Sequence, residues 1–84
     1  MAQYPQAGRS HGHGATLKYA VVYERTAHNY SAYVPDLPGC VSAAGTMAET
    51  RRLIRDAIKM HIEAMREAGE HVPQPGTSTE LIEV

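Results

Sequence analysis

The sequence predicts an α+β fold with the element order β-β-β-α-β, in which one long helix packs on one face of a three-stranded antiparallel meander and a returning strand joins the sheet. Short stretches of alternating hydrophobicity fill residues 17–44, as in strands joined by tight turns. A capped amphipathic pattern follows at residues 47–68. A proline-stiffened connection then leads to a last alternating stretch at residues 79–84, which we expect to be the returning strand.

Length and composition indicate one small globular domain. The chain has 84 residues, of which 43% are hydrophobic and 20% charged. A core of this size supplies little net stability, so we expect the chain to oligomerise. A formal net charge of −1 argues against a stand-alone nucleic-acid binder, which is usually strongly basic. The single cysteine excludes an internal disulfide and suits a cytoplasmic protein. No apolar run approaches the roughly 20 residues that span a membrane.

The first 15 residues include three Gly, two Gln and two His and show no periodicity, so we interpret residues 1–15 as a disordered leader and 16–84 as a single domain. Within the leader, His11 and His13 could bind a metal ion through two imidazoles. Two ligands on a glycine-flanked segment would bind weakly and without selectivity, which favours a leader, native or added, over a metal site.

Two strands form the predicted first hairpin. Residues 17–25 alternate with apolar side chains on both faces, which is typical of a central strand. Residues 26–29 form a short loop, and residues 29–34 form the second strand. In this second strand, Tyr30 and Tyr33 fall on opposite faces.

A rigid corner connects the second strand to the third, which we place at residues 40–44. The corner contains Pro35 and Pro38, which lack the N–H that a sheet requires, and Gly39, which can adopt a positive φ. Asp36 is expected to accept hydrogen bonds from nearby backbone, as Asp often does in turns. Cys40 is interpreted as a small buried hydrophobe rather than a nucleophile, because no activating base can be identified.

The helix is predicted from Met47 to Ala68. Thr46 and Glu49 match a capping box at its start, and Gly69 is suited to end it. Apolar residues recur every three or four positions along the helix and form one apolar stripe. His61 lies on this stripe, and we interpret it as a residue at the edge of the core in preference to a catalytic base. Arg51, Arg52, Arg55 and Lys59 form a basic patch on the first half, which is a solvated face or a surface for an acidic partner or phosphate backbone.

These landmarks resemble one known family. The stretch from Tyr33 to Cys40, Tyr-Val-Pro-Asp-Leu-Pro-Gly-Cys, is followed in order by Gly45, Glu49, Gly69 and the pair Pro73 and Pro75. Together they are similar to the HicB-like antitoxin family. The resemblance implies a partial RNase H-like fold without nuclease activity, a small basic mRNA-cleaving toxin of the HicA type as partner, and a homodimer or homotetramer. Because no C-terminal DNA-binding domain follows, we do not expect this chain to bind operator DNA.

Three functions remain as alternatives: an antitoxin that occludes a toxin, a nucleic-acid-binding module that uses the basic helix face, and an orphan oligomeric domain without a surviving toxin. A nuclease is not expected, because no carboxylate pair falls on adjacent central strands, where two metal ions would be held. No cofactor is expected, since no phosphate-binding loop is present. The antitoxin interpretation is preferred, and its partner-binding residues are predicted to be Tyr30, Tyr33, Pro35, Asp36, Leu37, Pro38, Gly39, Arg51, Arg52 and Arg55.

Overall fold

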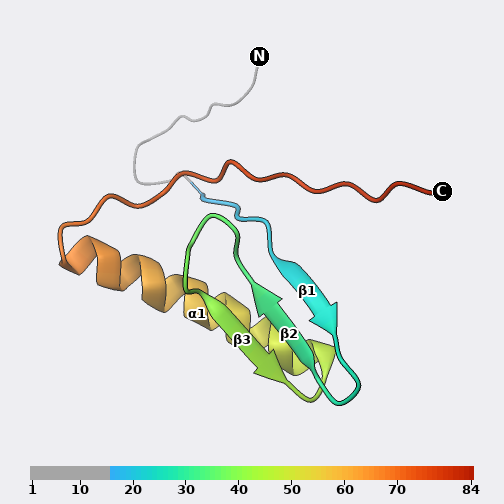
Figure 1. Ribbon diagram of the computed structural model, residues 1–84. Helices are drawn as coiled ribbons and strands as arrows, with labels where there is room; N and C mark the ends of the chain where they lie inside the picture. Colours follow the sequence, from blue (N-terminus) through green and yellow to red (C-terminus); the bar gives the residue numbers. More distant parts are fainter. Residues whose placement is uncertain (1–15) are drawn as a thin grey trace.

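The computed structural model describes residues 16–84, so the interpretation of residues 1–15, with His11 and His13, lies outside the described residues. Strands β1 (Val22–Arg25), β2 (Tyr30–Tyr33) and β3 (Val41–Ala44) form an antiparallel sheet in the order β1-β2-β3. Helix α1 (Met47–Glu67) packs along one face of this sheet and leaves the other face without a covering element within the described residues (Figure 1). The predicted α+β meander with one long helix is therefore confirmed.

The first hairpin closes around the side chain of Thr26. Its backbone N–H donates to the Asn29 carbonyl at 2.8 Å, and the Asn29 N–H donates to Thr26 Oγ1 at 3.0 Å. The Thr26 hydroxyl also lies 2.6 Å from the side-chain oxygen of Asn29. The polar groups of this loop are thus paired locally, as expected for Thr and Asn in a turn.

Strand β1 is shorter than predicted, because only Val22–Arg25 of the expected residues 17–25 are paired. The register places Val22 opposite Tyr33. Continuing that register would set Ala20 against Pro35, where β2 has turned into the corner and the chain offers no N–H. The ladder therefore stops, although the alternating pattern continues toward residue 17.

Both ends of α1 follow the predicted capping chemistry. Thr46 Oγ1 accepts a hydrogen bond from the Glu49 N–H at 3.1 Å. At the other end Gly69 has φ +73°, its N–H donates to Arg66 O at 3.1 Å, and the Glu70 N–H donates to Met65 O at 2.8 Å. These two bonds form a Schellman motif, which requires the positive φ that glycine tolerates.

The core lies between the sheet, the corner and α1. It consists of five almost fully buried apolar residues, packed by half-buried neighbours that include Tyr19, Tyr23 and Ile62. Thr50 is also fully buried, and its hydroxyl lies 2.8 Å from Thr46 O and 3.3 Å from Tyr30 O. The five core residues are Ala32, Val34, Leu37, Cys40 and Ile54.

The predicted returning strand is wrong for the chain as the structure describes it. Residues 79–84 are assigned to no strand, and every one of their side chains is exposed. The chain after α1 crosses the segment that leads into β1 and then projects beyond the sheet (Figure 1). The three-stranded sheet therefore has β1 and β3 as its two edges.

Candidate partner-binding surface

The corner between β2 and β3 is built from two successive turns. The Leu37 N–H donates to Val34 O at 3.0 Å, and the Cys40 N–H donates to Leu37 O at 3.0 Å. A third bond, from the Val34 N–H to Cys40 O at 3.2 Å, closes the base of the corner. Gly39 has φ +85°, as the third position of a Pro-Gly type II turn requires. The predicted rigid corner is therefore confirmed.

Asp36 links this corner to the chain that follows the helix. Its carboxylate accepts hydrogen bonds from the Gly76 N–H and the Thr77 N–H, both at 3.0 Å, and from the Thr77 hydroxyl at 2.9 Å. Tyr19 makes a second link, since its hydroxyl donates to Pro73 O at 2.6 Å. We call these contacts the clasp. The expected bonding of Asp36 to nearby backbone is thus corrected: its partners lie 40 and 41 residues away.

The clasp contains two ionisable groups, the Asp36 carboxyl and the Tyr19 phenol, and the protonation state of each suits the hydrogen bonds that it makes. The hydrogen bonds from the Gly76 and Thr77 N–H groups and from the Thr77 hydroxyl hold the pKa of Asp36 below its ordinary value. Partial burial raises the pKa of the Tyr19 phenol, and the Asp36 carboxylate raises it further. Asp36 is therefore an ionised acceptor and Tyr19 a protonated donor at neutral pH.

The clasp is expected to open in acid. A lowered folded-state pKa means that the clasp is fully formed above the ordinary aspartate value of 3.8 and is lost as the pH falls through the lowered pKa. In a nuclear magnetic resonance titration, the amide shifts of Gly76 and Thr77 should move with a midpoint below 3.8. Asp36→Ala should abolish that transition and speed amide exchange at both residues, whereas Asp56→Ala should not. A midpoint at or above 3.8 would contradict the clasp.

The face of the sheet away from α1 carries a row of apolar side chains. Tyr33 lies opposite Val22 in β1 and Val41 in β3, so the three residues cross the sheet side by side. Tyr33 is 40% exposed and Val41 is 64% exposed. In contrast Ala32, which points to the other face, is buried. We call Val22, Tyr33 and Val41 the open-face row.

The corner residues border this row but differ in accessibility. Pro35, Pro38 and Gly39 are exposed, and Asp36 is partly exposed within the clasp. Leu37, which was predicted as a partner-binding residue, has an exposure of 0%. Its side chain belongs to the core, and its contribution is to fix the corner.

Tyr30 lies on the opposite face from Tyr33, as the alternation predicts. It is half-buried beside the helix, its carbonyl is near the Thr50 hydroxyl, and the Arg25 guanidinium sits 5.9 Å from its ring centre. A contact at that distance is a cation–π interaction. Tyr30 therefore stabilises the fold, and Tyr33 is the tyrosine that faces outward next to the corner.

The three predicted arginines lie on the other side of the molecule. Arg51, Arg52 and Arg55 are exposed on α1. Arg52 forms an ion pair with Glu49 and lies 3.8 Å from Asp56. Glu49, expected to reach back to the cap, is engaged by Arg52 instead. The predicted partner-binding set is therefore divided between the open sheet face, which carries Tyr33, and α1, which carries the arginines.

We also considered Cys40 as a nucleophile, His61 as a catalytic base, and clusters of side chains that could bind a metal ion. Cys40 is buried, and burial raises the pKa of its thiol, which disfavours the reactive thiolate. His61 is half-buried on α1, consistent with a core-edge residue. Among residues 16–84, the structure contains no group of three or more His, Cys, Asp or Glu side chains placed to hold a metal ion. No helix in the described part of the chain is long and apolar enough to cross a membrane.

Sequence reasoning did not single out Val22 and Val41. Each is an ordinary strand residue in the sequence, and only the register across β1, β2 and β3 brings both beside Tyr33. The alternation of each strand was a usable signal, since it fixes which residues share a face. The register could not be read from alternation alone, because it depends on where each turn closes.

The uncovered sheet face thus presents an apolar row beside an exposed corner, and another protein could contact both. Comparison with known protein families identifies the family to which this chain belongs. The chain matches the family described as HicB_like antitoxin of bacterial toxin-antitoxin system over residues 19–83, and it belongs to that family.

Individual relatives agree with this assignment. The chain is 39% identical over 58 residues to an uncharacterized 14.9 kDa protein from the rep-hol intergenic region of Haemophilus phage HP1; the match covers 69% of this chain and 44% of that relative. It is 32% identical over 59 residues to UPF0150 protein Ta0767 of Thermoplasma acidophilum, covering 69% of this chain and 86% of the relative. The chain thus spans less than half the length of the phage protein.

A solved structure shares the fold. A chain in a HicA3 and HicB3 toxin-antitoxin complex is similar to this chain with a TM-score of 0.61 and 30% sequence identity, over 71% of this chain and 70% of that chain. The resemblance to this family that the sequence motifs indicated is therefore confirmed. The RNase H-like relationship stays a prediction.

Proposed function

We propose that this chain binds a small mRNA-cleaving toxin of the HicA type in the cytoplasm and neutralises it by covering the toxin's active surface, without catalysis of its own. Membership of the antitoxin family supports the class of function. The similarity to a chain of a HicA3 and HicB3 complex supports a HicA-type protein as the partner. Inhibition by occlusion needs only a shaped surface of about 800 Å².

The open-face row is the surface that we assign to the toxin. Tyr33 and Val41 offer exposed apolar area on a rigid sheet, and tyrosine is enriched among residues that dominate binding energy. Pro35 and Pro38 extend this surface with a pre-organised edge, so little conformational entropy is lost on binding. The observation that carries the assignment is the exposure of the row on the sheet face opposite α1.

Tyr33→Ala is the direct test. With HicA3 and the product of any small reading frame next to this gene as the two probes, the wild-type chain should bind and stop RNA cleavage. Tyr33→Ala should weaken binding by about 2 kcal/mol, roughly 30-fold, and restore cleavage at equal concentrations. The matched control is Met60→Ala, which truncates a side chain of 68% exposure on α1 and should leave inhibition unchanged.

The outcomes separate the alternatives. Inhibition that survives Tyr33→Ala but fails with Arg51→Glu/Arg55→Glu would move the toxin surface to the helix and overturn our assignment. Absence of binding to both probes would favour an orphan domain. The nucleic-acid alternative predicts RNA or DNA binding that weakens steeply with salt and depends on Arg51, Arg52 and Arg55. It is disfavoured by the pairing of Arg52 with Glu49 and Asp56.

A further inference from the structure

Strand β3 directs part of its backbone away from the sheet. Where β2 meets the corner, the Val34 N–H donates to Cys40 O at 3.2 Å, so these two residues form a hydrogen-bonded pair of the ladder between β2 and β3. Bonded and non-bonded pairs alternate along an antiparallel ladder. Val41 and Ala43 are then the residues of β3 that do not bond to β2, and their N–H and C=O groups point to the outer edge.

The first hairpin leads independently to the same assignment. The Thr26 N–H donates to Asn29 O at 2.8 Å, which makes this pair a bonded one. Counting along the register of β1 and β2 in steps of two, Tyr33 bonds to Val22. The N–H and C=O groups of one strand residue point to the same side, so Tyr33 cannot also bond to Val41. The backbone groups of Val41 therefore face away from β2.

The outer edge of β3 is open and unprotected. Within residues 16–84 the sheet ends at β3, so no described strand pairs with this edge. Both Val41 and Ala43 are exposed. Proteins usually protect such an edge with charged residues, proline or a bulge. Strand β3 has the sequence Val-Ser-Ala-Ala and pairs with β2 without a bulge, so it has none of these protections.

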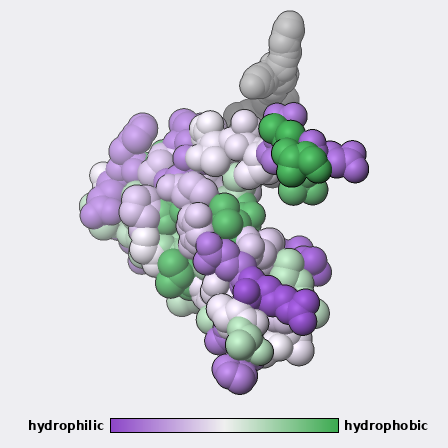
Figure 2. Space-filling model, turned by 45° about the vertical axis from the view of Figure 1, so that its right-hand side comes forward, coloured by the Kyte–Doolittle hydropathy of each residue, from purple (hydrophilic) through white to green (hydrophobic). Residues whose placement is uncertain are grey.

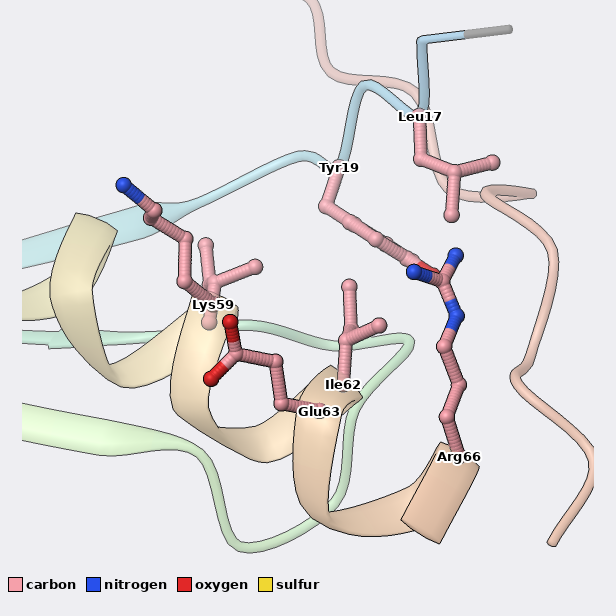
Figure 3. A pocket seen from close by; sticks show the side chains of 7 residues that line it. Leu17, Tyr19, Lys59, Ile62, Glu63 and Arg66 are labelled. Carbon is pink, nitrogen blue, oxygen red and sulfur yellow. The ribbon is translucent and has the colours of Figure 1, made fainter. Parts of the chain in front are cut away.

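The edge of β1 differs in each respect. Its last two residues, Glu24 and Arg25, are charged and exposed. Figure 2, in which the β1 side is turned forward, shows hydrophilic residues gathered where β1 ends. Before β1, Leu17 and Tyr19 line a groove against α1 (Figure 3). Tyr19 is also bonded to Pro73, and the chain after α1 crosses this segment (Figure 1). An incoming strand would therefore meet charges and a crossing segment at β1, but neither at β3.

The open edge of β3 adjoins the open-face row. Val41 belongs to both, because its side chain is in the row and its backbone is at the edge. A standard protein interface involves about 20–30 residues on each side, so the three residues of the row account for only a small part of one. A strand laid along β3 would place its residue opposite Val41 on the same face as the row. The edge therefore continues the surface that we assign to the toxin.

We infer that an extended segment of the toxin pairs with the outer edge of β3, bonding to the N–H and C=O groups of Val41 and Ala43. This inference rests on the proposed function, since the toxin is the occupant. The backbone bonds fix the register of the added strand and contribute affinity. Apolar side chains at alternate positions of the segment extend the open-face row and provide specificity. The partner segment is therefore a strand that is apolar on one face.

Amide hydrogen exchange, followed residue by residue in nuclear magnetic resonance spectra, is the first test. In the free chain the amides of Val41 and Ala43 should exchange fast, and those of Ser42 and Ala44 slowly. Binding of whichever probe, HicA3 or the neighbouring product, forms the complex should slow exchange at Val41 and Ala43 by about tenfold or more. Protection of these two amides already in the free chain would mean that another segment or a second copy occupies the edge, which would contradict the inference.

Ala43→Pro is the second test. It removes an N–H that points outward and no bond to β2, and proline is tolerated at such edge positions. The proline ring also obstructs an incoming strand, so binding of the toxin should weaken by about 30-fold or more. Ala43→Ser keeps both the N–H and a small side chain and should bind like the wild type. Equal affinities of the two variants would refute strand pairing.

The combined outcomes distinguish this inference from the proposed function. Binding and inhibition by the wild type without slower exchange at Val41 and Ala43 would refute the added strand and leave the proposed function standing. Failure of both probes to bind would overturn the proposed function and the inference with it. Urea unfolding shows whether Ala43→Pro is folded; if it is not, the exchange measurement on the wild type decides alone.

Discussion

Replacing Leu37 by alanine is expected to lower the free energy of unfolding by about 2–5 kcal/mol, the usual range for truncating a fully buried leucine. Leu37 lies in a loop, yet its exposure is 0% and it belongs to the cluster of five core residues. Its backbone also joins the two turns of the corner, donating to Val34 and accepting from Cys40. The substitution removes the side chain that fixes the corner to the core and leaves a cavity behind.

Urea denaturation followed by circular dichroism measures this loss. Val41→Ala is the matched control, because Val41 is a neighbouring apolar residue of 64% exposure, and its truncation should change stability by only about 0.5 kcal/mol or less. Leu37→Met, which keeps the volume, should cost less than about 1.5 kcal/mol. A loss below about 1 kcal/mol for Leu37→Ala would show that the corner is not part of the cooperative core.

The parts of this fold that the sequence predicted well are those determined by nearby residues. Gly39 adopts the positive φ of a Pro-Gly turn, Thr46 caps α1, and Gly69 ends it through a Schellman motif. In each case the group that needs a partner and the group that supplies it lie within a few residues. Such features depend little on tertiary context, so composition and spacing are sufficient to place them.

Contacts between segments that are distant in the sequence could not be predicted from local composition and spacing. The carboxylate of Asp36 binds residues 76 and 77, and nothing in the spacing distinguishes them from the nearer amides of its own turn. Likewise, alternation at residues 17–21 and 79–84 indicates β structure but does not name the neighbouring strand. The structure pairs neither segment with another strand. The strand predicted at residues 79–84 and the early start predicted for the first strand were therefore wrong.

In the candidate partner-binding surface, too, local sequence predicted some features, whereas others depend on tertiary packing. Alternation separated Tyr30 from Tyr33, but only packing shows that Tyr30 lies beside the helix and that Tyr33 is exposed. Leu37 occupies the middle of the family motif, and its identity alone does not reveal whether it contacts a partner or the core. A short loop normally exposes its side chains, so complete burial of Leu37 is a property of the folded corner and not of the local sequence.

Ile54→Ala is the second substitution with a large expected effect, again about 2–5 kcal/mol. Ile54 is 2% exposed and is the residue of α1 that enters the cluster containing Leu37 and Ala32. Alanine is the better helix former, so the change should leave α1 itself intact or stabilised. The measured loss therefore reports the packing of α1 on the sheet and slightly understates it.

Thermal and urea unfolding of Ile54→Ala should be compared with Met60→Ala, which makes a similar truncation on the same helix at a position of 68% exposure and should be nearly neutral. Combining Ile54→Ala with Leu37→Ala then asks whether helix and corner share one core. Because both side chains belong to one buried cluster, the two losses should differ from additivity by about 0.5 kcal/mol or more. Strict additivity would mean that α1 and the corner are stabilised independently, and the rigidity that we assign to the toxin-binding surface would then not depend on the helix beneath it.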